Sequence, residues 1–255
     1  QISDPHLFAD STKKFLGVNT AESFVEVVKL VANTEKADLV ILTGDLAQDC
    51  SRAAYEYALN VCQIFSCPVY WLAGNHDAPL LMQEVFMHSK IANDKYIKRA
   101  NWQFILLNSH YPTHVEGSLA VSELDFLEAC VEKDKQKYAW VFLHHHPLPL
   151  QSEWLDRSQL VNSEALWQSV TKYPQIKGLA CGHVHQEYAT EYQGIALVTA
   201  PATSIQFLPR SEKFGLDDQA PGYRWFEFNE DGSWQSGVQR LENFKVLPDH
   251  QAAGY

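Results

Sequence analysis

Five short groups of carboxylate, amide and imidazole side chains occur between residues 4 and 185, and each follows a short apolar segment. Such side chains are ligands for iron, manganese and zinc. Gathered in one place, they suit a pair of metal ions that hydrolyses a phosphate ester. The groups are Asp4 and His6; Asp45, in Gly44-Asp45; Asn75, His76 and Asp77; His144, His145 and His146; and His183 and His185.

Two of these groups have a spacing that suits chelation. In Asp4-x-His6 and His183-x-His185, side chains two positions apart lie on the same side of an extended segment. Asp45 lies between them in the sequence and could bridge two metals. Two divalent ions, two carboxylates and a bridging hydroxide leave the site positive, so it could hold a phosphate although the net charge is −11. The hydroxide would be generated by the metals, which lower the pKa of bound water.

The apolar segments in front of these groups are typical of buried strands in an α/β fold. Strands are predicted at Ile2-Ser3 and at residues 38–43, 68–73, 102–107, 138–143 and 176–181. Helices are predicted at residues 19–36, capped by Asn19; at 51–65; at 122–132, capped by Ser122; and at 160–173. Because ligands of α/β sheets bind beyond the carboxyl ends of the strands, the five groups should converge in one crevice.

The pattern changes after residue 186. Residues 187–192, 195–199, 223–228 and 234–239 are predicted to be antiparallel strands. Gln193-Gly194 and Asp231-Gly232 are predicted to form the hairpin turns between them. Residues 201–221 lack a regular pattern and are predicted to form a loop near the site.

As a set, the five motifs resemble the five blocks of the calcineurin-like metallophosphoesterase superfamily, in the same order along nearly the whole chain. Residues 43–49, 143–149 and 220–224 are most similar to the bacterial class III 3′,5′-cyclic-AMP phosphodiesterases. The resemblance implies an α/β fold, a four-layer αββα sandwich of two mixed sheets flanked by helices. It also implies a single domain over residues 1–255. Because the chain opens inside the first predicted strand, further residues are expected to precede Gln1 in the protein.

The resemblance further implies a role for each residue. One metal would be held by Asp4, His6, Asp45 and His185, and the other by Asp45, Asn75, His144 and His183. His76 would lie beside the phosphate, with Asn75 and His185, and would protonate the leaving ribose oxygen. The metals would be iron, manganese or sometimes zinc. The reaction would convert 3′,5′-cyclic AMP to 5′-AMP.

Some assignments stay open at this point. Many relatives carry Asp or Asn three residues after the bridging Asp, whereas this chain has Gln48 there. Asp77 or Asp49 could therefore orient His76, or neither could. Asp77 could instead be the N-cap of a helix that starts near residue 78, and Asp49 could be a charge at a helix N-terminus. His145 could support a ligand or face the substrate. His110 and His114 are expected to be solvated loop residues.

Composition limits the classes of function. The 20 Lys and Arg against 31 Asp and Glu give no basic excess, which argues against a nucleic-acid surface. No apolar run could span a membrane. Five cysteines without a C-x-x-C pair predict no disulfide framework, which favours the cytoplasm. The sequence leaves the oligomeric state open, and a dimer is among the options.

The sequence also bears on three other functions. A protein phosphatase is disfavoured by Gln48-Asp49-Cys50 and by Asp77, where such relatives carry Asp-Arg-Gly and Glu. A broad-specificity phosphodiesterase or nucleotidase, acting on other cyclic nucleotides or glycerophosphodiesters, fits the motifs equally well. An inactive scaffold is disfavoured because scaffolds of this superfamily have lost ligands and this chain has lost none.

Overall fold

Two β-sheets pack face to face in the computed structural model, which describes residues 1–34 and 36–254. The larger sheet has the strand order β10-β11-β9-β8-β7-β6. Its strands are β6 (Tyr96–Arg99), β7 (Trp102–Leu106), β8 (Tyr138–Leu143), β9 (Ile176–Cys181), β10 (Tyr188–Tyr192) and β11 (Ile195–Thr199). β7, β8, β9 and β11 are parallel, and β6 and β10 pair antiparallel at the two edges, so the sheet is mixed.

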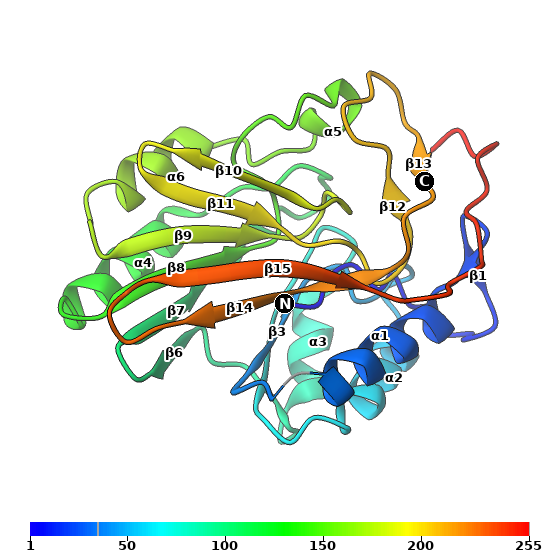
Figure 1. Cartoon of the computed structure of the whole chain (residues 1–255), viewed down its shortest axis with the longest axis horizontal. Coiled ribbons are helices and arrows are strands. Elements are labelled where there is room, and N and C mark those ends of the chain that lie inside the picture. The colour runs from blue at the N-terminus through cyan, green and yellow to red at the C-terminus, as the bar shows by residue number, and fades with distance from the viewer. Residues whose placement is uncertain (35, 255) are drawn as a thin grey trace.

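The second sheet is centred on β3 (Val40–Thr43), which is parallel to β4 (Val69–Leu72). β5 (Ile91–Ala92) extends it on the far side of β4. Ile2 forms a parallel bridge with Leu42 of β3, and Gln1 exchanges backbone hydrogen bonds with Arg224. Arg224 belongs to β14 (Gly222–Phe228), which pairs antiparallel with β15 (Trp234–Arg240). The first residues of the chain therefore join the β14–β15 hairpin to β3, beside the N-terminus in Figure 1.

Helices cover the outer face of each sheet (Figure 1). Helices α1 (Thr20–Thr34), α2 (Arg52–Cys62) and α3 (Pro79–Phe86) pack on β3 and β4. Helices α4 (Val121–Lys133) and α6 (Ser163–Val170) pack on the larger sheet, and the short α5 (Glu153–Asp156) lies between β8 and α6 in sequence. Ile41, Leu72, Trp140 and Phe142 belong to the apolar layer between the sheets. The predicted four-layer αββα sandwich is confirmed.

The bounds of several predicted elements agree with the structure, and the bounds of others differ. Asn19 caps α1 as predicted, since its Oδ1 accepts a hydrogen bond from the Glu22 amide at 3.1 Å. The predicted end of that helix includes Glu35, which lies outside the described residues. Ser122 does not cap α4, because the helix already begins at Val121 with Ala120 as N-cap.

Strand pairing after β9 also differs from the prediction. β11 pairs parallel with β9. This is because β10 is the edge strand, and the chain then turns back so that β11 lies between β10 and β9. Inside the predicted loop 201–221, β12 (Gln206–Phe207) pairs with β13 (Leu216–Asp217). A second short ribbon, β1 (Lys14–Phe15) with β2 (Val18–Asn19), was not predicted. Neither were α5, β5 and β6, whereas α3 agrees with the alternative of a helix that starts near residue 78.

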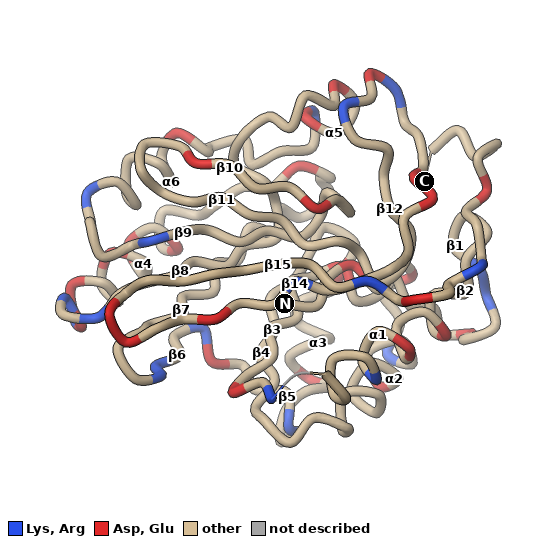
Figure 2. Tube along the Cα trace, in the orientation of Figure 1, with Lys and Arg blue, Asp and Glu red and all other residues tan. Residues whose placement is uncertain are grey.

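Among the described residues, no helix combines the length and the apolar composition needed to cross a bilayer. In Figure 2, Lys and Arg are scattered along the chain among Asp and Glu, in keeping with a net charge of −11.

Candidate metal centre

All the predicted metal-ligating side chains converge where the carboxyl ends of the two sheets meet. Thr43 and Leu72 end β3 and β4 in one sheet, and Leu143 and Cys181 end β8 and β9 in the other. The loop that begins after each of these residues carries potential ligands, and Asp4 and His6 follow Ile2, which bridges to β3. Since these strands run in parallel within each sheet, their ends lie on one edge, as the sequence pattern predicted.

One group of potential ligands joins the start of the chain to the loop after β9. The ligand atoms of Asp4, His6 and His185 all lie within 4.8 Å of one another. The Nε2 atoms of His6 and His185 are 3.1 Å apart, and His185 Nε2 is 3.3 Å from Asp4 Oδ1. Asp45 Oδ2 is 3.7 Å from His6 Nε2, so its carboxylate borders this group.

A second group lies on the other side of Asp45. His144 Nε2 is 3.3 Å from Asp45 Oδ2 and 3.2 Å from Asn75 Oδ1. The His144 and His183 rings pack edge to face with their centroids 5.1 Å apart. Asp45 Oδ2 therefore lies between imidazoles of both groups, in a position to bridge two ions.

Two buried atoms in these groups fit a cation. Asp45 Oδ2 and His183 Nδ1 have no hydrogen-bond partner among the described residues, although both are shielded from solvent. An unsatisfied buried polar atom costs about 1–3 kcal/mol, and more when charged. A metal ion beside Asp45 and His183 would satisfy both atoms, and the set of carboxylate, imidazole and amide donors suits iron, manganese or zinc.

Hydrogen bonds on the outer nitrogens fix how the imidazoles face the centre. The Nδ1 atoms of His6, His144 and His185 lie 2.6, 2.7 and 2.8 Å from an oxygen acceptor in each case. These acceptors are Gln48 Oε1, the Thr43 carbonyl and the Ile205 carbonyl. Since such oxygens only accept, each Nδ1 carries a proton, and Nε2 is the nitrogen that faces the centre and would be free to bind an ion.

Burial and nearby charges shift the pKa values of these groups. Burial lowers the pKa of His6 to about 3, so its ring is neutral near pH 7 and can donate a lone pair. Burial by itself would raise the pKa of Asp45, but the nearby imidazoles, His144 first, hold that pKa well below its usual value. Burial opposes protonation of His144, but the Asp45 carboxylate raises its pKa to about 9. Without a metal, the negative charge of Asp45 is therefore met by His144.

The backbone at the centre is held in a conformation that residues other than glycine seldom adopt. Five potential ligands have positive φ angles between 47° and 66°. They are Asp4, His6, Asp45, His183 and His185. Each such residue costs roughly 1–3 kcal/mol, and this strain persists only where the surrounding structure imposes it. Gly44 has a φ of +95° and lies so near His144 that an added Cβ would be 2.5 Å from its Nδ1.

His76 lies at the rim of the centre. Its backbone amide donates to Asp45 Oδ1 at 2.8 Å, and its half-buried ring packs edge to face on His6, with centroids 5.1 Å apart. This ring is therefore placed to meet a molecule that enters the centre from solvent.

Asp77 is not the helix N-cap that was considered, because α3 has Ala78 as its N-cap. The buried Asp77 carboxylate instead accepts backbone hydrogen bonds from Leu46, Ala47 and Gly74, at 3.0–3.2 Å. It thus ties together the loops that carry Asp45 and Asn75.

Asp49 joins two loops as well. Its Oδ2 accepts from the Ala9 amide at 2.9 Å, and its Oδ1 accepts from the Ser51 amide at 3.2 Å. The loop after β3 is thereby bound to the loop that follows His6.

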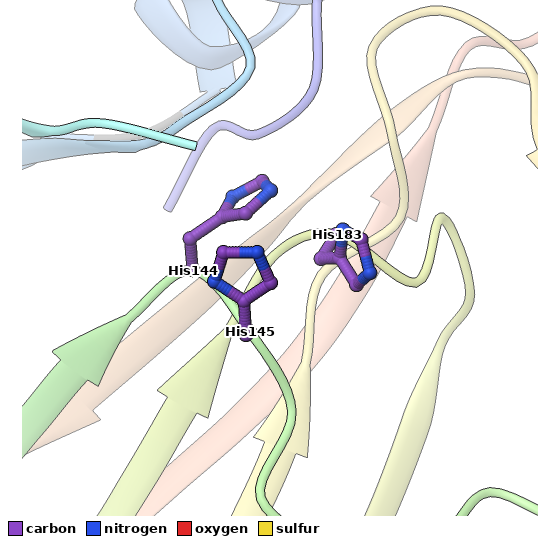
Figure 3. A group of neighbouring side chains, drawn as sticks. All are labelled: His144, His145 and His183. Carbon is purple, nitrogen blue, oxygen red and sulfur yellow. The ribbon is translucent and has the colours of Figure 1, made fainter. Parts of the chain in front are cut away.

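The three rings in Figure 3, His144, His145 and His183, gather from the loops after β8 and β9. His145 Nδ1 lies 2.8 Å from Ser109 Oγ, and His145 Nε2 lies 3.1 Å from the Val115 carbonyl. Both nitrogens are therefore engaged by the loop after β7, which indicates a supporting role. Sequence reasoning missed Ser109, which belongs to no motif.

Two predicted solvated histidines differ from each other. His114 is exposed and stacks on Tyr111, whereas His110 is half-buried. Burial lowers the pKa of His110, and Asp45 and His144 are among the charges that act on it. His110 is thus only partly exposed to solvent and lies near enough to the centre for these charges to act on it.

A cavity of about 450 Å³ lies away from this centre. It surrounds the amino end of β3 at Leu39 and is bordered by residues of β14, among them Tyr223 and Phe226. None of the converging ligands lines it, so the chemistry of the chain is concentrated at the opposite end of the sheets.

Comparison with known proteins places these features in context. Residues 1–187 match the family model of the calcineurin-like phosphoesterases. The chain is 36% identical over 256 residues to the 3′,5′-cyclic adenosine monophosphate phosphodiesterase CpdA of Pseudomonas aeruginosa, covering 100% of this chain and 94% of that protein. It is 37% identical over 257 residues to the protein of that name from Escherichia coli, with the same coverage. A dimetal phosphatase from Danio rerio has the same fold, with a TM-score of 0.65, 15% identity and 97% coverage of each chain.

Proposed function

Because the chain belongs to the calcineurin-like phosphoesterase family, we propose that it is a metal-dependent phosphodiesterase that hydrolyses 3′,5′-cyclic AMP to 5′-AMP. The observation that carries this proposal is the position of Asp45 Oδ2, buried without a hydrogen bond between His6 and His144. The choice of cyclic AMP rests on relatives of that activity, which align with the chain over its full length.

Two metal positions share Asp45 in this proposal. Asp4, His6 and His185 complete the first, and Asn75, His144 and His183 complete the second. Bound there, the two ions would polarise the phosphate and activate water for attack on phosphorus. Mixed carboxylate and imidazole donors favour iron and manganese, with zinc as a further option.

The chain contributes orientation and a proton. Asn75 and His185 border the space where the phosphate binds, and the His76 ring stands at its rim. When the bond between phosphorus and the ribose 3′ oxygen breaks, that oxygen needs a proton, and His76 donates it. Asp77, Asp49 and His145 hold the loops that position these groups.

The proposal also covers the extent of the catalytic domain, its location and its partners. The whole of residues 1–255 acts as one catalytic domain on a small cyclic nucleotide in the cytoplasm. It needs neither nucleic acid nor a membrane, and it could work as a monomer or as a dimer.

A comparison of substrates tests the proposal. Turnover of cyclic AMP, cyclic GMP, 2′,3′-cyclic AMP and a glycerophosphodiester should be measured with Mn²⁺ and after chelation. We expect the highest kcat/KM for cyclic AMP, complete loss on chelation, and no activity for Asp45→Ala. A preference for a glycerophosphodiester would show a broad-specificity enzyme instead, and activity that survives chelation would refute metal-dependent catalysis.

A further inference from the structure

His183 faces the metal centre through a different nitrogen from the other three imidazoles. In His6, His144 and His185 the outward nitrogen is Nδ1. In His183 the outward nitrogen is Nε2, which lies 2.9 Å from Ser158 Oγ, while the buried Nδ1 has no hydrogen-bond partner. The contact with Ser158 therefore determines which nitrogen of His183 is free for a metal.

The direction of this hydrogen bond follows from the other partner of Ser158. A hydroxyl has one hydrogen to donate, and Ser158 Oγ donates it to the Leu155 carbonyl at 2.8 Å. The lone pairs of Ser158 Oγ are left to accept, so His183 donates from Nε2–H. A neutral imidazole protonated at Nε2 carries its lone pair on Nδ1.

Ser158 is itself held in place. It follows α5, whose residue Asp156 accepts hydrogen bonds from the Leu150 and Ser152 amides. Two residues after Ser158, the Leu160 amide donates to the His146 carbonyl at 3.0 Å. The segment that carries Ser158 is thus anchored to the loop of His144, next to the second metal position.

Packing restricts His183 to one orientation. The His146 ring stacks on it, with centroids 5.7 Å apart and an angle of 20° between the planes. The backbone amide of His183 donates to both oxygens of Asp4, at 3.1 Å each. A ring flip would place the carbon Cε1 where Nε2 now lies, and so would break the bond to Ser158.

We infer that Ser158 is a positioning residue, whose hydroxyl keeps the proton of His183 on Nε2 and so presents Nδ1 to the metal position formed with Asp45, Asn75 and His144. This inference rests on the proposed function. It concerns only the second position, because the first uses His6 and His185, whose outward nitrogens bind Gln48 and the Ile205 carbonyl.

The test uses the full chain as wild type, Ser158→Ala, Ser158→Thr and Ser163→Ala. Ser158→Thr keeps the hydroxyl, and Ser163, at the start of α6, is a serine outside the centre. The metal-free proteins are titrated with Mn²⁺ by calorimetry. For Ser158→Ala we expect one ion to bind roughly 10–100-fold more weakly and the other to bind as in wild type. Ser158→Thr and Ser163→Ala should bind both ions as wild type does.

A second measurement needs neither metal nor activity. Nitrogen-15 NMR of the metal-free protein reports the tautomer of each histidine. We expect His183 protonated at Nε2 in wild type and Ser158→Thr, and a mixture of tautomers in Ser158→Ala. Wild-type affinity for both ions together with an unchanged tautomer in Ser158→Ala would overturn the inference. Failure of wild type to bind any ion would refute the proposed function, whereas the tautomers would still decide the role of Ser158.

Discussion

The Thr43 carbonyl at the end of β3 accepts a hydrogen bond of 2.7 Å from His144 Nδ1, which follows β8 in the other sheet. This bond crosses the interface between the two sheets and leaves His144 Nε2 beside Asp45 and Asn75. The relative position of the sheets therefore sets the geometry of the proposed second metal position. Changes to single side chains at this junction should separate metal binding from turnover.

Asn75→Ala should weaken the second metal position and reduce turnover. The variant loses the amide oxygen that lies 3.2 Å from His144 Nε2. Loss of a direct ligand should lower affinity by at least the roughly 10–100-fold seen for supporting residues. Metal analysis after dialysis, together with cyclic AMP turnover, would check this. Full activity with a single ion bound would contradict a shared, two-metal centre.

His76→Ala should leave both ions bound and slow cleavage by roughly 10²–10⁴-fold, the usual contribution of a proton donor. A substrate with a good leaving group, such as a nitrophenyl diester, needs less protonation and should lose less activity. Kinetics with the two kinds of substrate would show the difference. Equal losses for both would exclude His76 as the acid.

Gln48→Met should weaken the first metal position. The substitution keeps the length of the side chain but removes the oxygen that lies 2.6 Å from His6 Nδ1. The expected loss is roughly 10–100-fold in affinity for one ion. Combined with Ser158→Ala, it should weaken both ions in a Mn²⁺ titration. If the double variant weakened only one ion, the two side chains would be serving the same position.

Asp77→Ala should destabilise the protein by about 2–5 kcal/mol, because three backbone amides lose their buried acceptor. Tyr55→Phe removes a hydroxyl that lies 3.3 Å from Asp77 Oδ1 and accepts from the Ala78 amide at 2.8 Å, and should cost about 1–2 kcal/mol. Urea unfolding of the metal-free proteins would measure both changes. Similar costs for the two variants would show that Asp77 contributes little to the loops.

The metal-free protein should lose stability as pH falls from about 6.5 towards 3. His6 has a folded pKa of about 3 and an unfolded value near 6.5, so in this range the unfolded chain binds the extra proton. Burial also lowers the pKa of His145, His146 and His183. Near pH 7 two groups act in the opposite direction, since burial raises the pKa of Asp77 to about 7 and the Asp45 carboxylate raises that of His144 to about 9. They are outnumbered by these four histidines and His110, whose pKa burial also lowers.

Thermal unfolding of the chelated protein at pH 7 and pH 4.5 would check this expectation. The Tm should be lower at pH 4.5, and the difference should shrink in His6→Gln, which removes one of the histidines with a lowered pKa. A Tm that rises on acidification would show that Asp77 and His144 outweigh these histidines.

The parts of the fold that the sequence predicted are those with a strong local pattern. β8 is a continuous apolar run and β9 is mostly apolar because both faces of their sheet are covered, and their bounds agree with the prediction. Most of the candidate ligands were recognised because they follow such strands. The two-residue strand β5 has too few residues for a periodic pattern, and the parallel pairing of β11 depends on a partner distant in sequence.

The supporting residues of the site were harder to predict for a related reason. Ser158 and Ser109 matter only because folding brings them to His183 and His145. Nothing in their own neighbourhood of the sequence distinguishes them from other loop serines. Asp77 was recognised as a candidate, but its bonds to Leu46 and Ala47 depend on how close two loops come in space.

The order of the ligands along the chain has a consequence for biosynthesis. Asp4 is made first and His185 last among them, and the Ile205 carbonyl that orients His185 follows later still. A nascent chain therefore cannot complete the proposed metal site until Ile205 has been translated. Binding of both proposed ions would thereby be deferred until the two halves of the sandwich close on each other.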